Sequence, residues 1–391
     1  MSGTDPHQLL VLGGGPAALA AVRAYRRAGG QGRVGLVSDE RRVPYMRPAL
    51  SKELLRGEID DSEIALESDA GLAEAAIELV AGRAVSLDPG RHTVLLSGGR
   101  ELAYSRCLLA TGAEPARLVV PGAEDGSVRT LRTLEDLREL RSRLTHDGEV
   151  VVIGSGFIGC EIAASLRAIG HPVRLCSQET APNVGRLGPD AAARLQAWLT
   201  EARIELALGA EVSSIRRDGE RIEVHTAAGA VAGDVVVMAT GVAPRSELGA
   251  QAGLALESGA IPADTQMATA LPDVFAAGDV ALAVNATAGR RVHIEHWGDA
   301  IAQGEVAGQV AAGASAQWAD VPGFWSEIAG HTLKFAGWGE GFDEVRLEPS
   351  HDGAFAAWYR HGDRIAGVLA HERDDAYESG RELIAAGASW R

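Results

Sequence analysis

The chain has 391 residues, with 37 lysines and arginines against 53 aspartates and glutamates, and a formal net charge of -16. At roughly 100–200 residues per domain, this length predicts two to four domains. The acidic balance disfavours a nucleic-acid binder, because a polyanion needs a basic face. Cys107, Cys160 and Cys176 are too few and too scattered for a disulfide framework or a zinc site. No signal peptide or membrane span is evident, so we expect a reduced, cytoplasmic protein without a metal.

Two parts of the chain repeat one pattern of strand, glycine-rich turn, helix and strand. In the first part these elements are expected, in order, at residues 8–12, 13–18, 17–28 and 33–37, and in the second at 149–153, 154–159, 161–169 and 172–176. Their strands are continuously apolar, which is typical of a parallel sheet covered on both faces. The sequence therefore predicts an α/β fold with two doubly wound, Rossmann-like dinucleotide-binding units.

Two similar segments mark where each unit is expected to finish. Cys107-Leu-Leu-Ala-Thr-Gly112 and Val236-Val-Met-Ala-Thr-Gly241 are short apolar strands, each followed by a proline-bearing turn. An apolar strand within 273–281 suits the first sheet, which a returning segment would complete. Beyond residue 321, clustered aromatic residues and alternation predict a small antiparallel sheet with a final helix near 377–386. The expected domains are a discontinuous nucleotide-binding domain, a second one and a small C-terminal α+β domain, at 1–118 with 241–320, at 119–240 and at 321–391.

The glycine turns carry the spacing that a dinucleotide requires. Glycine is needed where the chain bends sharply and where backbone approaches the pyrophosphate, and a small third residue lets helix and strand pack closely. These three positions are held by Gly13, Gly15 and Ala18 in the first unit, and by Gly154, Gly156 and Gly159 in the second. Ordinary tight turns are the alternative. Two matches that each follow a strand favour two dinucleotide sites, with phosphates at the helix N-termini.

A carboxylate at the end of the second strand of each unit would accept hydrogen bonds from a ribose. The acids within reach are Asp39 and Glu40 in the first unit and Glu179 in the second. No arginine or lysine within 177–185 could meet a 2′-phosphate, so NAD is favoured over NADP. Arg174 and Arg186 leave NADPH open.

The order of these motifs, ending in Phe275-Ala-Ala-Gly-Asp279, resembles that of the FAD-dependent pyridine nucleotide-disulfide oxidoreductases, which have a glutathione-reductase-like fold. Segments 44–52, 294–297 and 321–326 are similar to the ferredoxin reductase and apoptosis-inducing-factor branch of that family. The resemblance covers essentially the whole chain. It implies FAD in the first unit, NADH in the second and an interface domain at the C-terminus.

The resemblance also implies which residues hold the cofactors. Asp279, after Gly278, would bond the ribityl or phosphate region of FAD, with a helix N-cap as the alternative. Glu295, His296 and Trp297 precede an expected helix at 299–310, whose dipole would face the flavin, although His296 and Trp297 read alone are packing residues. The further implied contacts are Pro16, Ala17, Arg47, Val85, Ala110, Thr111, Gly112, Arg132, Ile158, Thr240, Gly241 and Trp325.

Lys52 is one of only two lysines in the chain, which suggests a need for a compact charge. The resemblance implies that it lies beside the flavin and pairs with Glu161 on the nicotinamide domain, where the pair would tune the flavin and align nicotinamide. A solvated lysine is the alternative. For Phe157, inside the second turn, the resemblance implies an aromatic gate at the nicotinamide pocket. A position in the hydrophobic core is the alternative.

No cysteine lies in the segment 42–48, where family members that reduce disulfides, peroxides or persulfides would carry one. We therefore expect an FAD-dependent NADH oxidoreductase that passes electrons to an external one-electron acceptor, a [2Fe–2S] ferredoxin or another redox carrier. The alternative is a slow NADH oxidase or redox sensor of the apoptosis-inducing-factor kind, in which reduced flavin and NAD⁺ stay together. A flavin-binding partner without turnover is a third reading. Both a monomer and a homodimer fit the sequence.

Overall fold

The computed structural model describes residues 5–390. Its first part is a parallel sheet with the strand order β19-β7-β1-β2-β3, and every neighbouring pair is parallel. These strands lie, in that order, at Val274–Ala276, Cys107–Leu109, Leu9–Leu12, Val34–Ser38 and Ile77–Ala81. Because β19 follows the whole second unit in the chain, a returning segment completes the first sheet, as the sequence predicts.

The central strand β1 is apolar throughout because both of its faces are covered. Leu9 and Val11 pack in the core with helices α1 (Pro16–Arg27) and α8 (Trp297–Ala311). Leu10 and Leu12 pack on the other side with a three-stranded antiparallel sheet. That sheet consists of β4, β5 and β6, at Ala84–Asp88, Thr93–Leu96 and Glu101–Ala103.

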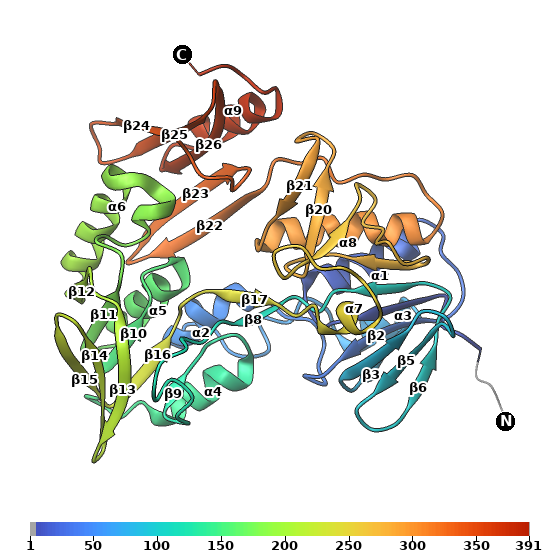
Figure 1. Cartoon of the computed structure of the whole chain (residues 1–391), viewed down its shortest axis with the longest axis horizontal. Coiled ribbons are helices and arrows are strands. Elements are labelled where there is room, and N and C mark those ends of the chain that lie inside the picture. Colours follow the sequence, from blue (N-terminus) through green and yellow to red (C-terminus); the bar gives the residue numbers. More distant parts are fainter. Residues whose placement is uncertain (1–4, 391) are drawn as a thin grey trace.

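Helix α8 lies against α1 at backbone distance (Figure 1). A Cβ built on Gly304 would lie 2.2 Å from the backbone oxygen of Ala17, and one on Gly308 would lie 2.1 Å from that of Ala21. Only glycine permits this approach. The other elements of this part are the 3₁₀ turn Arg47–Ser51, α2 (Glu53–Arg56), α3 (Asp69–Glu74), α7 (Glu247–Gln251), β18 (Ile261–Ala263), β20 (Ala281–Asn285) and β21 (Arg290–His293).

The second part is another parallel sheet, with the strand order β12-β11-β10-β16-β9. These strands lie, in that order, at Glu205–Leu208, Val173–Ser177, Val150–Ile153, Val235–Met238 and Val128–Arg129. Helices and an antiparallel sheet surround it: α4 (Leu134–Arg143), α5 (Phe157–Ala168), α6 (Val184–Glu201), β13 (Val212–Asp218), β14 (Arg221–Thr226) and β15 (Gly229–Gly233). The expected start of α5 at Glu161 is wrong by one turn. The helix begins directly after Gly156, and Gly159 lies inside it as a close-packing residue rather than in the turn.

The two parts are joined by a pair of crossovers that form one antiparallel ribbon, visible at the centre of Figure 1. Its strands are β8 (Ala113–Pro115) and β17 (Val242–Pro244). The threonine of each Ala-Thr-Gly segment reaches across: Thr111 Oγ1 donates to the Arg245 carbonyl at 2.6 Å, and Thr240 Oγ1 donates to the Ala116 carbonyl at 2.7 Å. The ribbon therefore fixes the two units relative to each other.

The third part is an antiparallel sheet with the order β22-β23-β26-β25-β24 and a final helix α9, standing over the second unit in Figure 1. Its elements lie at Gly323–Ile328, His331–Gly337, Arg364–His371, Phe355–His361, Glu344–Pro349 and Asp374–Ala385. The three five-stranded sheets each fall inside one of the expected domain ranges. The exact boundaries of these domains stay a proposal. Within residues 5–390, no helix is long and apolar enough to cross a membrane.

The C-terminal sheet contacts α6 through an aromatic stack. The Trp198 and His331 rings lie 4.2 Å apart and nearly parallel, and the His371 ring lies 4.8 Å from Trp198. Burial lowers the pKa of His331, and the neighbouring His371 lowers it further.

This histidine makes the folded protein sensitive to acid. The unfolded chain, with a histidine pKa of about 6.5, binds a proton that folded His331 takes up only at lower pH. The contribution of His331 to the free energy of unfolding is therefore fully present above the unfolded pKa of about 6.5 and is lost as the pH falls from there through the lowered value. A His331→Phe variant, which keeps the stack, should lose less Tm between pH 7 and pH 5 than the unmodified protein. Equal losses in thermal unfolding would contradict this.

Candidate functional site

One large cleft lies where the three parts of the chain meet. It has a volume of about 2190 Å³, and its walls include both glycine turns, the start of α8 and strand β22. A single drug-sized ligand takes roughly 300–1,000 Å³. The cleft therefore has room for two dinucleotides.

The first glycine of each turn is required by the backbone. Gly13 has a φ of 141° and Gly154 a φ of 106°, a region that side-chain-bearing residues avoid. A Cβ on Gly13 would lie 2.0 Å from the Ala110 carbonyl oxygen, and one on Gly154 would lie 2.3 Å from that of Ala239. Each turn therefore packs against the strand that ends in Ala-Thr-Gly.

The second glycine of each turn borders open space instead. A Cβ on Gly15 or Gly156 would meet no atom within 4 Å, and both residues line the cleft. Gly15 is the N-cap of α1 and Gly156 that of α5; neither helix has a side-chain cap or an acidic residue in its first turn. Unpaired N–H groups at a helix start bind anions. Both turns therefore fit a pyrophosphate.

The third position of each turn lies behind the cleft. A Cβ on Gly159 would lie 2.0 Å from the Gly154 carbonyl oxygen, so the second unit needs glycine there. Ala18 is fully buried in the first unit, where helix and strand leave room for a methyl group. Both residues act through packing, and neither lines the cleft.

The two acids after β2 are placed differently. Asp39 is exposed and lines the cleft. Glu40 instead accepts hydrogen bonds from Arg47 Nη2 at 2.5 Å and from the Tyr45 hydroxyl at 2.6 Å. Burial raises the pKa of Tyr45, so its hydroxyl stays a donor. Asp39 is therefore the carboxylate left to meet a ribose, while Glu40 fixes Arg47.

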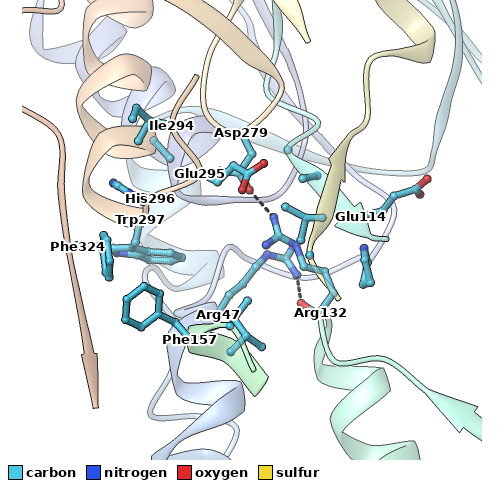
Figure 2. A pocket seen from close by; sticks show the side chains of 18 of the residues that line it. Arg47, Glu114, Arg132, Phe157, Asp279, Ile294, Glu295, His296, Trp297 and Phe324 are labelled. Carbon is cyan, nitrogen blue, oxygen red and sulfur yellow. Dashed lines mark hydrogen bonds and ion pairs between the residues drawn. The ribbon is translucent and has the colours of Figure 1, made fainter. Parts of the chain in front are cut away.

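Asp279 lies at the centre of the cleft and pairs with Arg132 at 2.7 Å (Figure 2). The helix N-cap interpretation is wrong, because the next element is strand β20. Arg47 Nη1 donates to the Arg132 carbonyl at 2.8 Å. Glu295 lies beside Asp279 (Figure 2). Desolvation raises the pKa of the Glu295 carboxyl, and the negative charge of Asp279 raises it further. The cleft thus presents two arginines and two carboxylates at this point.

Helix α8 begins with its backbone N–H groups toward the cleft. Its first residue is Trp297 and its N-cap is His296, two residues before the expected start at Asp299. The Asp299 carboxylate is buried, lies 3.3 Å from His296 Nδ1 and accepts the Gly323 N–H at 3.2 Å. His296 and Trp297 are half-buried on the cleft wall, so neither is a core packing residue.

An aromatic cluster closes one side of the cleft (Figure 2). The Phe157 ring meets the Phe324 ring edge to face at 4.8 Å, and the His296 ring lies 4.7 Å from Phe324. Phe157 is half-buried: it lines the cleft and also packs against the core of the second part, so the gate and core interpretations both stay open. Phe324 was not singled out from the sequence, because its partners come from two other domains. Its position directly before Trp325 is the only available signal.

Lys52 and Glu161 form an ion pair of 2.6 Å between Lys52 Nζ and Glu161 Oε2. Their side chains are only 4% and 5% exposed, so the solvated-lysine alternative is wrong. Lys52 Nζ also lies 5.0 Å from the centre of the Trp325 ring, which is 45% exposed at the cleft. The pair joins the first and second parts of the chain, and its catalytic role stays a prediction.

Glu179 lies just beyond β11 and holds its own loop in place. Its carboxylate accepts hydrogen bonds from Ser155 Oγ at 3.2 Å, from the Asn183 N–H at 3.2 Å and from the Gly185 N–H at 3.1 Å. Arg186 lines the same cleft. Arg174 lies off the cleft and pairs with Glu205 at 2.7 Å, so it does not support NADPH.

The remaining implied contacts all line the cleft. They are Pro16, Ala17, Val85, Ala110, Thr111, Gly112, Ile158, Thr240, Gly241 and Gly278. Their contact with a cofactor stays a prediction.

No cysteine lines the described part of the cleft. Cys107, Cys160 and Cys176 are all buried, as packing residues are. Burial raises the pKa of Cys176 to about 11 and raises those of the other two thiols still more. None of the three is placed or activated to form a disulfide beside the cleft.

Two facing dinucleotide turns, with a third domain closing one cleft, define a two-nucleotide oxidoreductase fold. A family model described as pyridine nucleotide-disulphide oxidoreductase matches residues 7–304, and one described as reductase C-terminal matches residues 323–391. The chain belongs to the pyridine nucleotide-disulphide oxidoreductase family. FAD and NADH are the cofactors of this family of reductases.

Similar proteins include members of both branches considered above. Apoptosis-inducing factor 3 of Homo sapiens is 34% identical over 98% of this chain, and the chain spans 64% of its length. The ferredoxin reductase component of chlorobenzene dioxygenase from Cupriavidus sp. (strain PS12) is 32% identical over 97% of this chain and 92% of that protein. The solved ferredoxin reductase from Rhodopseudomonas palustris has a TM-score of 0.92 and 31% identity, covering 98% of this chain and 95% of its own.

Proposed function

We propose that this chain is an FAD-dependent NADH oxidoreductase that passes electrons to an external one-electron carrier, a [2Fe–2S] ferredoxin. The observation that carries the proposal is the pair of uncapped helix starts facing one cleft that no described cysteine lines. Such a cleft binds two dinucleotides and offers no protein thiol as an electron relay. The likeness to a dioxygenase ferredoxin reductase component supports the choice of carrier.

Bound FAD supplies the chemistry, because it can take a hydride from NADH and release electrons singly. The protein's part is alignment, electrostatics and exclusion of water. The α8 N-terminus would direct its positive dipole end toward the flavin, which gains negative charge on reduction, and the buried Lys52–Glu161 pair would set the local charge nearby. The ring of Phe157, packed on Phe324, would shield a bound nicotinamide from solvent. The Glu179 carboxylate disfavours a 2′-phosphate, so NADH is the donor.

An anaerobic stopped-flow experiment tests this function. NADH should bleach the bound flavin, and a [2Fe–2S] ferredoxin or cytochrome c added next should restore its colour rapidly. A long-wavelength absorbance that persists for minutes would instead support the NADH-sensor alternative, which the likeness to apoptosis-inducing factor 3 favours. No bleaching by NADH would contradict both.

We further propose that the protein works in the cytoplasm, as a monomer or homodimer. The domain ranges proposed from the sequence agree with this function, because the Lys52–Glu161 pair then lies where the first and second domains meet.

A further inference from the structure

The Glu161 carboxylate, on α5 of the second part of the chain, receives donors from both other parts. Lys52 Nζ and Ser51 Oγ, both from the first part, approach Oε2 at 2.6 Å each. Ser326 Oγ, from β22 of the C-terminal domain, donates to Oε1 at 2.6 Å. All four side chains are buried.

This arrangement leaves the carboxylate little freedom. A buried charge is tolerated only when it is paired and hydrogen-bonded, and bonds to an ionised acceptor are the strong ones. Rotation of Glu161 away from Lys52 would break both hydroxyl bonds. Ser51 is itself fixed, because its backbone carbonyl accepts the Ser165 hydroxyl at 2.7 Å.

We infer that Ser51 and Ser326 are positioning residues that hold the Glu161 carboxylate against Lys52. They thereby set the electrostatic potential that this ion pair exerts on the flavin. The inference rests on the proposed function. Each hydroxyl draws part of the negative charge of Glu161 toward itself. Without a hydroxyl, more of that charge acts beside Lys52 and cancels its positive field. Reduced flavin, which carries extra negative charge, then becomes less stable.

Ser326 also gives the C-terminal domain a direct effect on the Lys52–Glu161 pair. Ser326 follows Trp325, whose ring lies over Lys52 at 5.0 Å. A shift of β22 therefore changes two neighbours of the same ion pair at once.

The test compares Ser326→Ala and Ser51→Ala with the matched control Ser246→Ala. Ser246→Ala removes a buried hydroxyl bond, at 2.7 Å to the Gly259 carbonyl, that involves neither Glu161 nor Ser51. The flavin midpoint potential is measured with a chemical reductant and an indicator dye, and the flavin reduction rate with increasing NADH. Melting temperatures report any purely structural loss.

We expect both serine variants to shift the potential to more negative values and to slow reduction at saturating NADH. The slowing should be roughly three- to tenfold, as the net loss of one ordinary hydrogen bond produces. The NADH concentration for half-maximal rate should change little. Ser326→Thr should restore both values, and Ser246→Ala should alter only the melting temperature. If Ser326→Ala does not fold, Ser326→Cys supplies the same comparison.

Potentials and rates in the Ser326 and Ser51 variants that match those of Ser246→Ala would overturn the inference. The potential does not depend on NADH. If NADH failed to reduce even the unmodified protein, the proposed function would fall, while the comparison of potentials would still decide the role of the serines.

Discussion

A Gly156→Glu variant should keep its FAD and lose reduction by NADH. The Cβ of residue 156 points into open space in the cleft, so the new side chain enters the site without disturbing the turn. Its carboxylate would then stand at the uncapped start of α5, where the NADH pyrophosphate is expected. Like charges that meet at a binding site cost several kcal/mol, so reduction at a fixed low NADH concentration should fall on the order of 100-fold or more.

Gly126→Glu is the matched control for this variant. Gly126 also borders open space, has no positive φ and does not line the cleft, so the same side chain there should leave reduction unchanged. Flavin absorbance measures retained FAD, and anaerobic stopped flow measures reduction. Normal reduction of Gly156→Glu would show that NADH does not bind at this turn.

A Glu161→Leu variant should lose about 3–5 kcal/mol of folding stability, because it leaves Lys52 buried without its partner. The double variant Lys52→Met with Glu161→Leu should regain much of this loss, since no uncompensated charge remains. Flavin reduction by NADH should slow in both, because the positive charge has lost its partner in the single variant and is absent in the double variant. Urea unfolding of the FAD-bound protein measures the first effect.

The other lysine of the chain provides the control for stability. Lys334 pairs with Asp374 at 2.7 Å, and these side chains are 38% and 73% exposed. Lys334→Met should therefore cost no more than about 1 kcal/mol. If Glu161→Leu were as mild as Lys334→Met, the buried pair would not be the coupling between domains that we describe.

The two nucleotide-binding units could be predicted because their signals are local. A continuously apolar strand, a glycine turn and a helix follow one another within about 30 residues, and each fixes the next. The helix starts at Phe157 and Trp297 were each placed too late. An aromatic residue beside a glycine has no strong helix propensity, so the sequence does not indicate that the helix begins there. The start depends on how the helix packs in the folded protein.

The partners of the site residues could not be predicted from the sequence. Glu40 follows a strand as a ribose-binding acid should, but Arg47 and Tyr45 occupy its carboxylate. Ser51 and Ser326 are both adjacent to residues that were singled out, yet the direction of a hydroxyl depends on how three domains meet. These contacts depend on how the domains pack against each other, and the periodicity of the sequence does not show that packing.

The most direct test of the account is an anaerobic titration of the purified, FAD-reconstituted protein with NADH. We expect one FAD per chain and complete bleaching of the flavin by about one equivalent of NADH, because each of the two turns holds one dinucleotide and they face one cleft. A protein that retained no flavin after reconstitution, or a flavin that excess NADH left oxidised, would contradict it.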